Sequence, residues 1–216
     1  MAIWILEGVQ GQGKTTTGAA ILTDAHEDGR DIVTNIDIKL PHTHFDLDYF
    51  QRVMDGEESL ENCTMFVDEF QQYMSSRRSA SRQNEAFSYF IFQVRKRGID
   101  FYATSHRLMN LDVRVRAEAS VEGVCEYHPE NPCRKCRGKG TYKGDQCDRC
   151  LGYGHRGIVR VKWLDRHGII NPESRRKRKR YVTEFEAHKY WHLFDTTERM
   201  PIQKKLVTLD TVEVRG

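Results

Sequence analysis

The amino-acid sequence predicts an α/β fold in which helices flank a mainly parallel central sheet. Along the first half of the chain, apolar runs of strand length alternate with segments of helical periodicity, as in βαβ units. A glycine-rich stretch, GVQGQGKT at 8–15, joins the first apolar run to the first helical segment. Later in the chain, a segment rich in Cys, Gly and Lys lies between two long strand-like runs, which predicts a β-hairpin with a small insertion at its tip.

The elements of the first half follow from periodicity and from turn residues. Short apolar runs predict strands, and apolar residues spaced three or four apart predict helices. In chain order, these patterns predict strands at 2–6, 31–37, 63–70 and 99–104, with helices at 15–28, around 47–54 and through 85–98. The polar, glycine-free stretch at 75–83 is expected to be a loop.

The pattern changes from about Ala117 onward. Two longer strands are expected at 119–127 and 157–165, followed by the basic run RRKRKR, a further strand and YWHLFDTTE. The sequence therefore predicts three parts: an α/β core at 1–124 that contains the glycine-rich stretch, an insertion on a β-hairpin at 125–157, and a segment at 158–216 that completes the core.

Length and composition limit the classes of protein. The 216 residues suffice for one α/β core and a small appendage. The 34 Lys and Arg against 31 Asp and Glu leave a charge of +3, so only local clusters could bind nucleic acid. No run approaches the ~18 apolar residues of a membrane span, and no secretory signal precedes the first strand. We therefore expect a cytoplasmic protein without an integral membrane segment, in which six cysteines favour metal over disulfides.

The octet GVQGQGKT fits the phosphate-binding pattern G-x-x-x-x-G-K-[ST] of a P-loop. Its glycines let successive backbone N–H groups point at phosphate oxygens. The lysine can reach the β- and γ-phosphates, and the threonine hydroxyl is placed to bind Mg²⁺. The alternative is a simple turn, but the strand before the loop and the helix after it favour a nucleotide. The expected contacts to ATP are Gly8, Gln10, Gly11, Gln12, Gly13, Lys14, Thr15 and Thr16.

Two acids end the apolar run TMFVDE at 64–69. In an open α/β sheet, the carboxyl ends of the strands form the edge at which the phosphate loop also lies. Asp68 is therefore expected to hold Mg²⁺ together with Thr15, and Glu69 to polarise the attacking water. At the end of the next strand, Ser105 or His106 could sense the γ-phosphate or cap the turn.

Several arginines compete for the role of a finger that compensates charge in a neighbouring subunit. Arg97, with Arg95 and Lys96, ends the helical segment before the fourth strand, where these charges could equally complement the helix dipole. The polar loop supplies Arg77, Arg78 and Arg82 as competitors.

CRKCRGKG at 133–140 and CDRCLGYG at 147–154 are two copies of C-x-x-C-x-G-x-G. Two such knuckles make a closed tetrahedral site that suits structural Zn²⁺, with the ligands Cys133, Cys136, Cys147 and Cys150. The knuckles resemble the repeats of the DnaJ zinc domain, with two repeats in place of four, which implies one zinc ion. Cys125 and His128 could form a variant ligand set, and Cys63 is expected in the core.

Together, GVQGQGKT, GRDIVTNID, MFVDEF, RKRGIDFYATSH and LFDTTE resemble the FtsK/HerA superfamily of P-loop ATPases, in its viral branch of Zot-like and genome-packaging proteins. The resemblance spans about residues 1–116 and 181–200. It implies the same roles for Lys14, Thr15, Asp68 and Glu69, and makes Arg97 the better finger candidate. Members of the superfamily often carry Gln after the fourth strand, where this chain has Ser105 and His106.

The resemblance further implies a homo-oligomer, a hexameric ring that moves double-stranded DNA through its centre. Zot-like proteins tend to continue into a membrane segment, and the lack of one favours packaging into a capsid over filament extrusion. We expect a location in the host cytoplasm or at the capsid vertex, with a capsid or assembly protein as partner. The basic run at 175–180 would bind phosphates in a salt-dependent way, or be a solvated loop. Two alternatives stay open: a Zot-like extrusion ATPase, and a nucleotide-gated zinc adaptor with slow hydrolysis.

Overall fold

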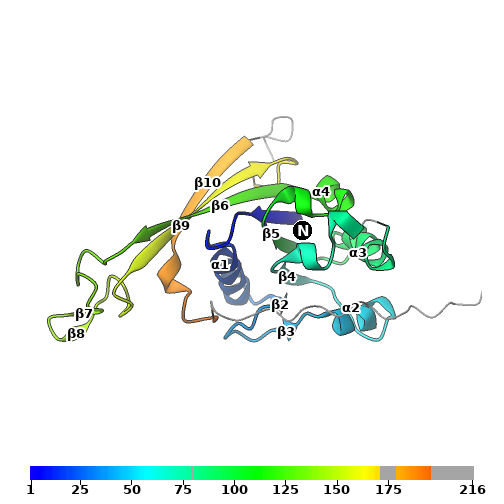
Figure 1. The fold of residues 1–216 in the computed structure, drawn as a ribbon. Helices are drawn as coiled ribbons and strands as arrows, with labels where there is room; N and C mark the ends of the chain where they lie inside the picture. Colours follow the sequence, from blue (N-terminus) through cyan, green and yellow to red (C-terminus); the bar gives the residue numbers. More distant parts are fainter. Residues whose placement is uncertain (79, 171–178, 196–216) are drawn as a thin grey trace, which may run out of the picture.

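The computed structural model describes residues 1–78, 80–170 and 179–195, and a central sheet runs through this part of the chain (Figure 1). The parallel strands and the helices of the body are β1 (Ile3–Glu7), α1 (Lys14–Glu27), β2 (Asp31–Thr34), β3 (Thr43–His44), α2 (Leu47–Met54), β4 (Cys63–Val67), α3 (Arg82–Gln93), β5 (Asp100–Ser105), α4 (Val113–Glu118) and β6 (Val121–Glu130). They are followed by β7 (Thr141–Tyr142), β8 (Asp145–Gln146), β9 (Arg156–Asp165) and β10 (Lys179–Glu186).

The sheet has eight strands in the described residues, in the order β10-β9-β6-β1-β5-β4-β2-β3. Every neighbouring pair from β3 to β6 is parallel, whereas β9 is antiparallel to both β6 and β10. The predicted α/β fold with a mainly parallel sheet is confirmed. Since β5 lies between β1 and β4, the strand before the phosphate loop and the strand before the two acids are one strand apart.

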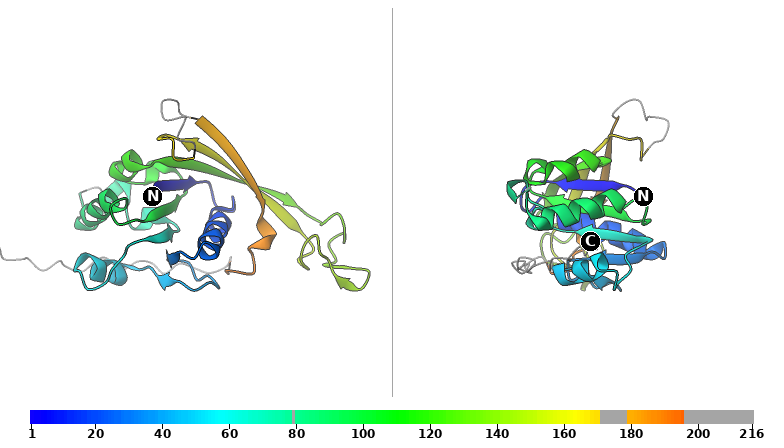
Figure 2. Two further views of the ribbon diagram at one scale, coloured as in Figure 1. Left: turned by 180° about the vertical axis from the view of Figure 1, so that it is seen from behind. Right: turned by 90° about the vertical axis from the view of Figure 1, so that its right-hand side faces the viewer.

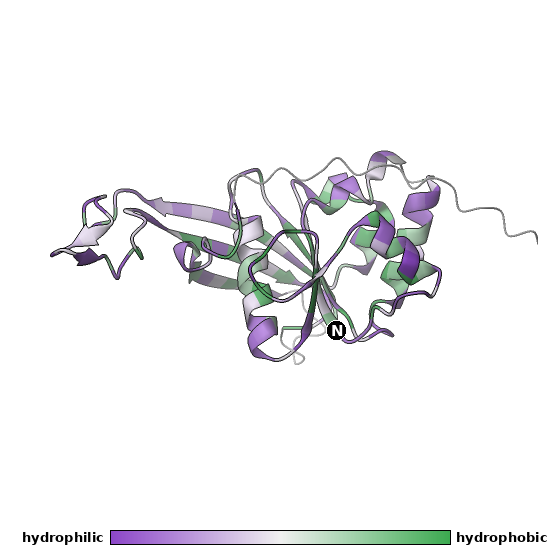
Figure 3. Cartoon of the chain, turned by 90° about the horizontal axis from the view of Figure 1, so that it is seen from below, coloured by the Kyte–Doolittle hydropathy of each residue, from purple (hydrophilic) through white to green (hydrophobic). Residues whose placement is uncertain are grey.

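Helices cover both faces of the sheet (Figure 2). In β1, β2 and β4, alternate side chains belong to different cores. One core lies beneath α2, α3 and α4 and is rich in aromatic rings, with Phe50 and Phe87 stacked at 4.0 Å between centroids. The other core lies beneath α1 and includes Leu22, Phe66 and Phe194. Apolar residues gather in the body, whereas the ribbon toward β7 and β8 is mainly hydrophilic (Figure 3).

Helix α1 packs closely on β4 because Gly18 faces the buried ring of Phe66. A Cβ atom at position 18 would overlap that ring. We expect Gly18→Ala to lower the free energy of unfolding by about 1–2 kcal/mol, since overpacking outweighs the gain in helix propensity. Urea denaturation measures the change, with Asp24→Ala on the exposed face of α1 as the control. A stabilised Gly18→Ala protein would show that Phe66 can move aside.

Two strands end earlier than the sequence predicted. The strands expected at 31–37 and 63–70 stop at Thr34 and Val67, so both predictions are wrong at their carboxyl ends. The cause is Asn35, whose side chain accepts a hydrogen bond from the N–H of Asp68 (2.7 Å) and donates one to its carbonyl (3.0 Å). Glu69 then takes a left-handed conformation with φ 52° and starts a 3₁₀ turn.

The stretch expected as a loop at 75–83 is partly helical. A 3₁₀ turn spans Ser76–Arg78, and α3 begins at Arg82, where the side chain of Ser81 accepts a hydrogen bond from the N–H of Asn84 at 3.2 Å. The loop prediction is therefore wrong for these residues, because Ser81 in this polar stretch caps a helix.

The predicted hairpin is present and projects from the body (Figures 1 and 2). Strands β6 and β9 pair continuously from Val121 opposite Asp165 to Glu130 opposite Arg156. The boundaries expected at 124/125 and 157/158 fall inside these strands, so the hairpin continues the central sheet without a break in backbone pairing. The small pair β7–β8 lies at its tip.

Parts of two sequence predictions lie outside the described residues. Of the basic run at 175–180, only Lys179 and Arg180 are described, at the start of β10, and of LFDTTE only residues 193–195 are described. Among the described helices, none is both long and apolar enough to cross a membrane.

Candidate nucleotide site and cysteine centre

The phosphate loop connects β1 to the amino end of α1. Gly11 and Gly13 have φ of 78° and 82°, a left-handed conformation that glycine adopts without strain. Gly13 is the residue before α1, so the first N–H groups of the helix and the positive end of its dipole face the loop. Gln10 is exposed in the loop, whereas Thr16 is buried within α1. The loop therefore has the backbone form expected for binding phosphate.

The side chain of Lys14 lies inside the phosphate loop and contacts the backbone at the start of the loop. This side chain is 6% exposed, and its Nζ donates hydrogen bonds to the carbonyl oxygens of Gly8 (2.8 Å) and Val9 (3.3 Å). An ammonium group has three donors, so one N–H can be donated to a phosphate oxygen while the other two hold the side chain across the loop.

The projecting hairpin holds the other side of the phosphate loop. The N–H of Tyr127 in β6 donates to Oε1 of Gln12 at 3.1 Å. A Cβ on Gly8 would lie 3.2 Å from the carbonyl oxygen of Cys125, and one on Gly13 would lie 2.5 Å from a methyl group of Val159 in β9. Gln12 was predicted to contact the nucleotide, but its side-chain oxygen accepts a hydrogen bond from the hairpin.

Asp68 lies opposite the start of α1, at the carboxyl end of β4. The hydroxyl of Thr15 donates to Oδ2 of Asp68 at 2.6 Å, and the hydroxyl of Thr104 donates to Oδ1. Asp68 is 5% exposed. A hydroxyl and a carboxylate at this separation can ligate one Mg²⁺ directly or through water, because this ion takes oxygen ligands and keeps several waters. The residues present thus fit the metal that the sequence predicted.

The alternation of strand residues explains which side chains reach this site. Successive side chains of a strand point to opposite faces of the sheet. In β4, Phe66 packs beneath α1 and Asp68 follows two residues later, on the same face. In β5, Thr104 takes this face, whereas the hydroxyl of Ser105 donates to the carbonyl of Arg107 at 2.9 Å. Ser105 therefore caps its own turn, and a sensor role for it stays a prediction.

Two site residues were missed as such. Asn35 holds the backbone of Asp68, and its signal was the TN pair after the second strand, quoted only as part of a family pattern. Thr104 accepts a hydrogen bond from the N–H of Glu69 at 2.9 Å in addition to its contact with Asp68. Its signal was the period of two along β5, which sets it on the face opposite to Ser105.

The carboxylate of Glu69 is held by two polar side chains. Its Oε2 lies 3.2 Å from Nε2 of His106 and accepts a hydrogen bond from the amide of Gln71. The side chain is 23% exposed, so a water molecule can reach it. Glu69 and His106 are thus brought together at the ends of two adjacent strands.

Arg97 lies at the opposite edge of the sheet. It precedes the amino end of β5, and its carbonyl accepts a hydrogen bond from the N–H of Asn62, just before β4. Since the phosphate loop lies at the carboxyl ends of the parallel strands, Arg97 is not brought to the site of its own chain. Arg95, Lys96, Arg77 and Arg82 are exposed, and within the described residues none of them has an ion pair with Asp68 or Glu69.

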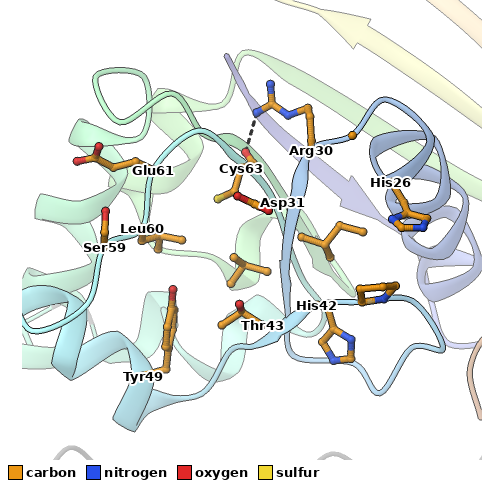
Figure 4. Close-up of a pocket in the computed structure, with 14 residues that line it drawn as sticks. His26, Arg30, Asp31, His42, Thr43, Tyr49, Ser59, Leu60, Glu61 and Cys63 are labelled. Carbon is orange, nitrogen blue, oxygen red and sulfur yellow. Dashed lines mark hydrogen bonds between the residues drawn. The ribbon is translucent and has the colours of Figure 1, made fainter.

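A separate cavity of about 510 Å³ lies beside the β2–β3 edge of the sheet (Figure 4). Its lining includes Arg30, Asp31, Tyr49 and Cys63, from the amino ends of β2 and β4 and from α2. A guanidinium N–H of Arg30 donates to the carbonyl of Cys63 at 2.8 Å (Figure 4). Burial raises the pKa of the Cys63 thiol to about 12, so this cysteine stays neutral, as expected for a core residue.

The four predicted zinc ligands meet at the tip of the hairpin. The Sγ atoms of Cys133, Cys136, Cys147 and Cys150 lie within 4.8 Å of one another, and all four residues are buried. Zinc–sulfur bonds of about 2.3 Å in a tetrahedron set sulfur atoms roughly 3.8 Å apart. The thiols are thus arranged as a structural zinc site requires, with no position left open for catalysis.

Each knuckle is fixed by the other. The N–H of Cys133 donates to the carbonyl of Gly154 (2.9 Å), and the N–H of Cys147 donates to the carbonyl of Gly140 (2.8 Å). Burial by itself would raise the pKa of Cys136, but hydrogen bonds from the backbone N–H groups of Gly140 and Gly138 and from neighbouring thiols lower it to about 7, whereas burial and the hydrogen bond with Cys136 raise the pKa of Cys150 to about 12. A thiolate is therefore stabilised where a cation would bind.

The alternative ligands Cys125 and His128 are not part of this cluster. Cys125 lies beneath α1, with its Sγ 3.7 Å from the hydroxyl of Thr17, and burial raises the pKa of its thiol to about 11. Nε2 of His128 lies 3.9 Å from a carboxylate oxygen of Glu126. The four-cysteine interpretation is therefore the one that the structure favours.

No protein-family model and no curated protein sequence matches the chain. Among solved structures, it is similar to the N-terminal domain of zonular occludens toxin from Neisseria meningitidis, at 16% identity and a TM-score of 0.53 over 90% of this chain and 98% of that chain. It also matches the DNA-packaging ATPase B204 from Sulfolobus Turreted Icosahedral Virus, at 11% identity and a TM-score of 0.49 over 84% of this chain and 96% of that chain. At such identities a likeness concerns the fold. With its phosphate loop and strand order, the chain has a P-loop NTPase fold.

Proposed function

We propose that the chain is an ATP-hydrolysing motor that works as a ring of identical subunits and packages viral or mobile-element double-stranded DNA into a capsid. The observation that carries the ATPase part is the contact between Thr15 and Asp68. It joins the end of the phosphate loop to an acid on β4, and Glu69 follows that acid directly. The DNA and capsid parts rest on the sequence resemblance to genome-packaging ATPases.

Each residue has a part in the proposed reaction. Lys14 is placed to neutralise charge on the β- and γ-phosphates, with the amino end of α1 below them. Mg²⁺, held by Thr15 and Asp68, would supply positive charge to the phosphate oxygens. Glu69 is placed to orient the attacking water and to accept its proton, and its backbone N–H is fixed by Thr104. The γ-phosphate is released as inorganic phosphate when the bond to the β-phosphate oxygen breaks.

The ring is proposed because Arg97 cannot serve its own site. It lies at the amino edge of the sheet, whereas Lys14 and Asp68 lie at the carboxyl edge. A finger from this position has to act on a neighbouring subunit, where a cation compensates charge that builds up in the transition state.

The experiment that tests the proposal is steady-state ATP hydrolysis with and without double-stranded DNA, at low and moderate salt. We expect DNA to increase the rate, more at low salt because phosphate contacts weaken with ionic strength. Hydrolysis that ignores DNA at every salt concentration would reject the motor and favour a zinc adaptor with slow hydrolysis. Absence of any hydrolysis in protein that binds ATP would reject the enzyme itself.

A second candidate is an ATPase of filamentous virus assembly. The observation that favours it is the fold shared with the zonular occludens toxin domain, at a TM-score of 0.53. The two candidates differ in location, so co-sedimentation with membranes in producing cells separates them: a packaging motor is expected with capsids and an assembly ATPase with the membrane fraction.

The hydroxyl of Thr104 gives a prediction specific to this site. Thr104→Val keeps the shape of the side chain but removes the hydrogen bonds to Asp68 and to the N–H of Glu69. We expect kcat to fall about 10- to 100-fold, because unpaired buried polar groups cost about 1–3 kcal/mol. Steady-state kinetics measures the change. Thr104→Ser should restore most of the rate. Ser105→Ala separates the two roles of Ser105: a small change fits its hydrogen bond to the carbonyl of Arg107, and a large loss of kcat would support the predicted γ-phosphate sensor.

A further inference from the structure

The projecting hairpin carries two kinds of cation. Those along β9 are paired: Arg160 with Glu184 (2.6 Å), Lys162 with Glu126 (2.5 Å), and Arg156 with Glu130 and Glu186. The partner acids stand on the neighbouring strands β6 and β10 or at their ends. The shaft of the hairpin is therefore neutralised by contacts within the chain.

The tip differs from the shaft. Arg137, Lys139 and Lys143 are exposed, and none of these side chains has an ion pair within the described residues. Lys143 lies over the ring of Tyr142 at 5.7 Å, and Lys135 lies over the same ring at 5.1 Å. The ring holds both ammonium groups near the surface of the tip, where one of them, Lys135, is also paired with Asp148.

The charge of the tip is positive even with zinc bound. Residues 133–154 contain six Lys and Arg against two Asp, a difference of +4. Four thiolates and one Zn²⁺ would contribute −2, which leaves the tip at about +2. Within this stretch, Arg134 and Arg149 pair with Glu130 and Lys135 pairs with Asp148, so the exposed cations left without an ion pair in the described residues are Arg137, Lys139 and Lys143.

We propose that the tip of the β6–β9 hairpin is a DNA-binding surface, in which Arg137, Lys139 and Lys143 contact the phosphodiester backbone of double-stranded DNA. The choice of DNA as the polyanion rests on the proposed function. The contact is independent of base sequence, because these cations would bind phosphate groups and not base edges. The zinc site supports the surface by fixing the two knuckles that present the cations.

The test is equilibrium binding of a labelled DNA duplex without nucleotide, across about 50–200 mM salt. The logarithm of the binding constant falls with the logarithm of the salt concentration, and the loss of three phosphate contacts should make this negative slope less steep by about 2.7. We expect the triple variant Arg137→Gln, Lys139→Gln, Lys143→Gln to show this loss of slope and at least a tenfold lower affinity at the lowest salt. Zinc content, measured on the same samples, reports whether the tip is still folded.

The control variant removes the same charge elsewhere: Lys39→Gln, Arg52→Gln and Lys189→Gln, all exposed on the body of the molecule. Its affinity should stay within about twofold. Equal losses in both variants, or no loss in the tip variant, would overturn the proposal. So would polyglutamate that competes as well as DNA at equal charge, since the tip would then suit acidic proteins.

Failure of this inference is distinguishable from failure of the proposed function. The binding assay contains no nucleotide, and ATP hydrolysis by the unmodified protein is measured in parallel. Loss of slope in the tip variant together with absent hydrolysis would reject the motor and leave the DNA-binding tip standing. DNA-stimulated hydrolysis by the unmodified protein, together with an unchanged slope in the tip variant, would reject the DNA-binding tip and leave the motor standing.

Discussion

Glu69→Gln is expected to lower the steady-state rate of ATP hydrolysis by about 10²- to 10⁴-fold, the range that general bases contribute. The amide keeps the size of the side chain and can still contact Gln71 and His106, but it cannot accept a proton from water. Because Lys14, Thr15 and Asp68 are untouched, the affinity for ATP should change only a few fold. Single-turnover kinetics and equilibrium binding of a labelled nucleotide measure the two quantities separately.

A matched control for this change is Glu118→Gln, an exposed acid at the end of α4. Its hydrolysis rate should stay within about twofold of the unmodified protein. If Glu69→Gln hydrolyses ATP at the full rate, another group orients the water, and the assignment of Glu69 as the base is wrong. If it loses nucleotide binding together with hydrolysis, the residue supports the phosphate loop instead.

Cys136→Ser is expected to abolish stoichiometric zinc binding and to unfold the tip while the central sheet stays folded. The four cysteines are the whole of the buried apolar cluster that the structure describes at the tip, so nothing else there replaces the metal. Structural zinc sites contribute on the order of 10 kcal/mol to the folding of small domains. Metal analysis should give one zinc per chain before the change and clearly less after it.

Hydrogen exchange of backbone amides shows where the loss occurs. Amides of residues 133–154 should exchange as in an unfolded chain, whereas those of β1 and β5, in a separate core, should keep their protection. His128→Ala is the control, since His128 lies outside the cluster and the variant should retain its zinc. Zinc lost from His128→Ala and retained by Cys136→Ser would overturn the four-cysteine site.

The fold was predictable because its signals are local. Alternating strand and helix patterns predicted the parallel sheet, and two repeats of one cysteine motif predicted a centre at the tip of a hairpin. Both depend on residues near one another in the sequence. The ends of β2 and β4 were not predictable in this way, since they depend on a contact between Asn35, after β2, and the backbone of Asp68, after the adjacent strand β4.

The candidate site shows the same limit. Lys14, Thr15 and Asp68 were identified from motif and order, and the structure brings them together. Ser105 was predicted as the site residue and Thr104 was not, because both are hydroxyl residues at the end of β5. They differ only in the face of the sheet to which their side chains point. Gln12 was assigned to the nucleotide because nothing in the sequence shows that β6 returns to the phosphate loop.

That return of β6 links two binding events by thermodynamics. Val124 is the last residue of β6 paired with β1, and Tyr127, where β6 has extended past β1, donates its N–H to Gln12. A shift of the phosphate loop on binding ATP would therefore act on β6 at the point where the hairpin begins to project. By linkage, whatever factor ATP applies to the affinity of the tip for its ligand, that ligand applies to the affinity for ATP.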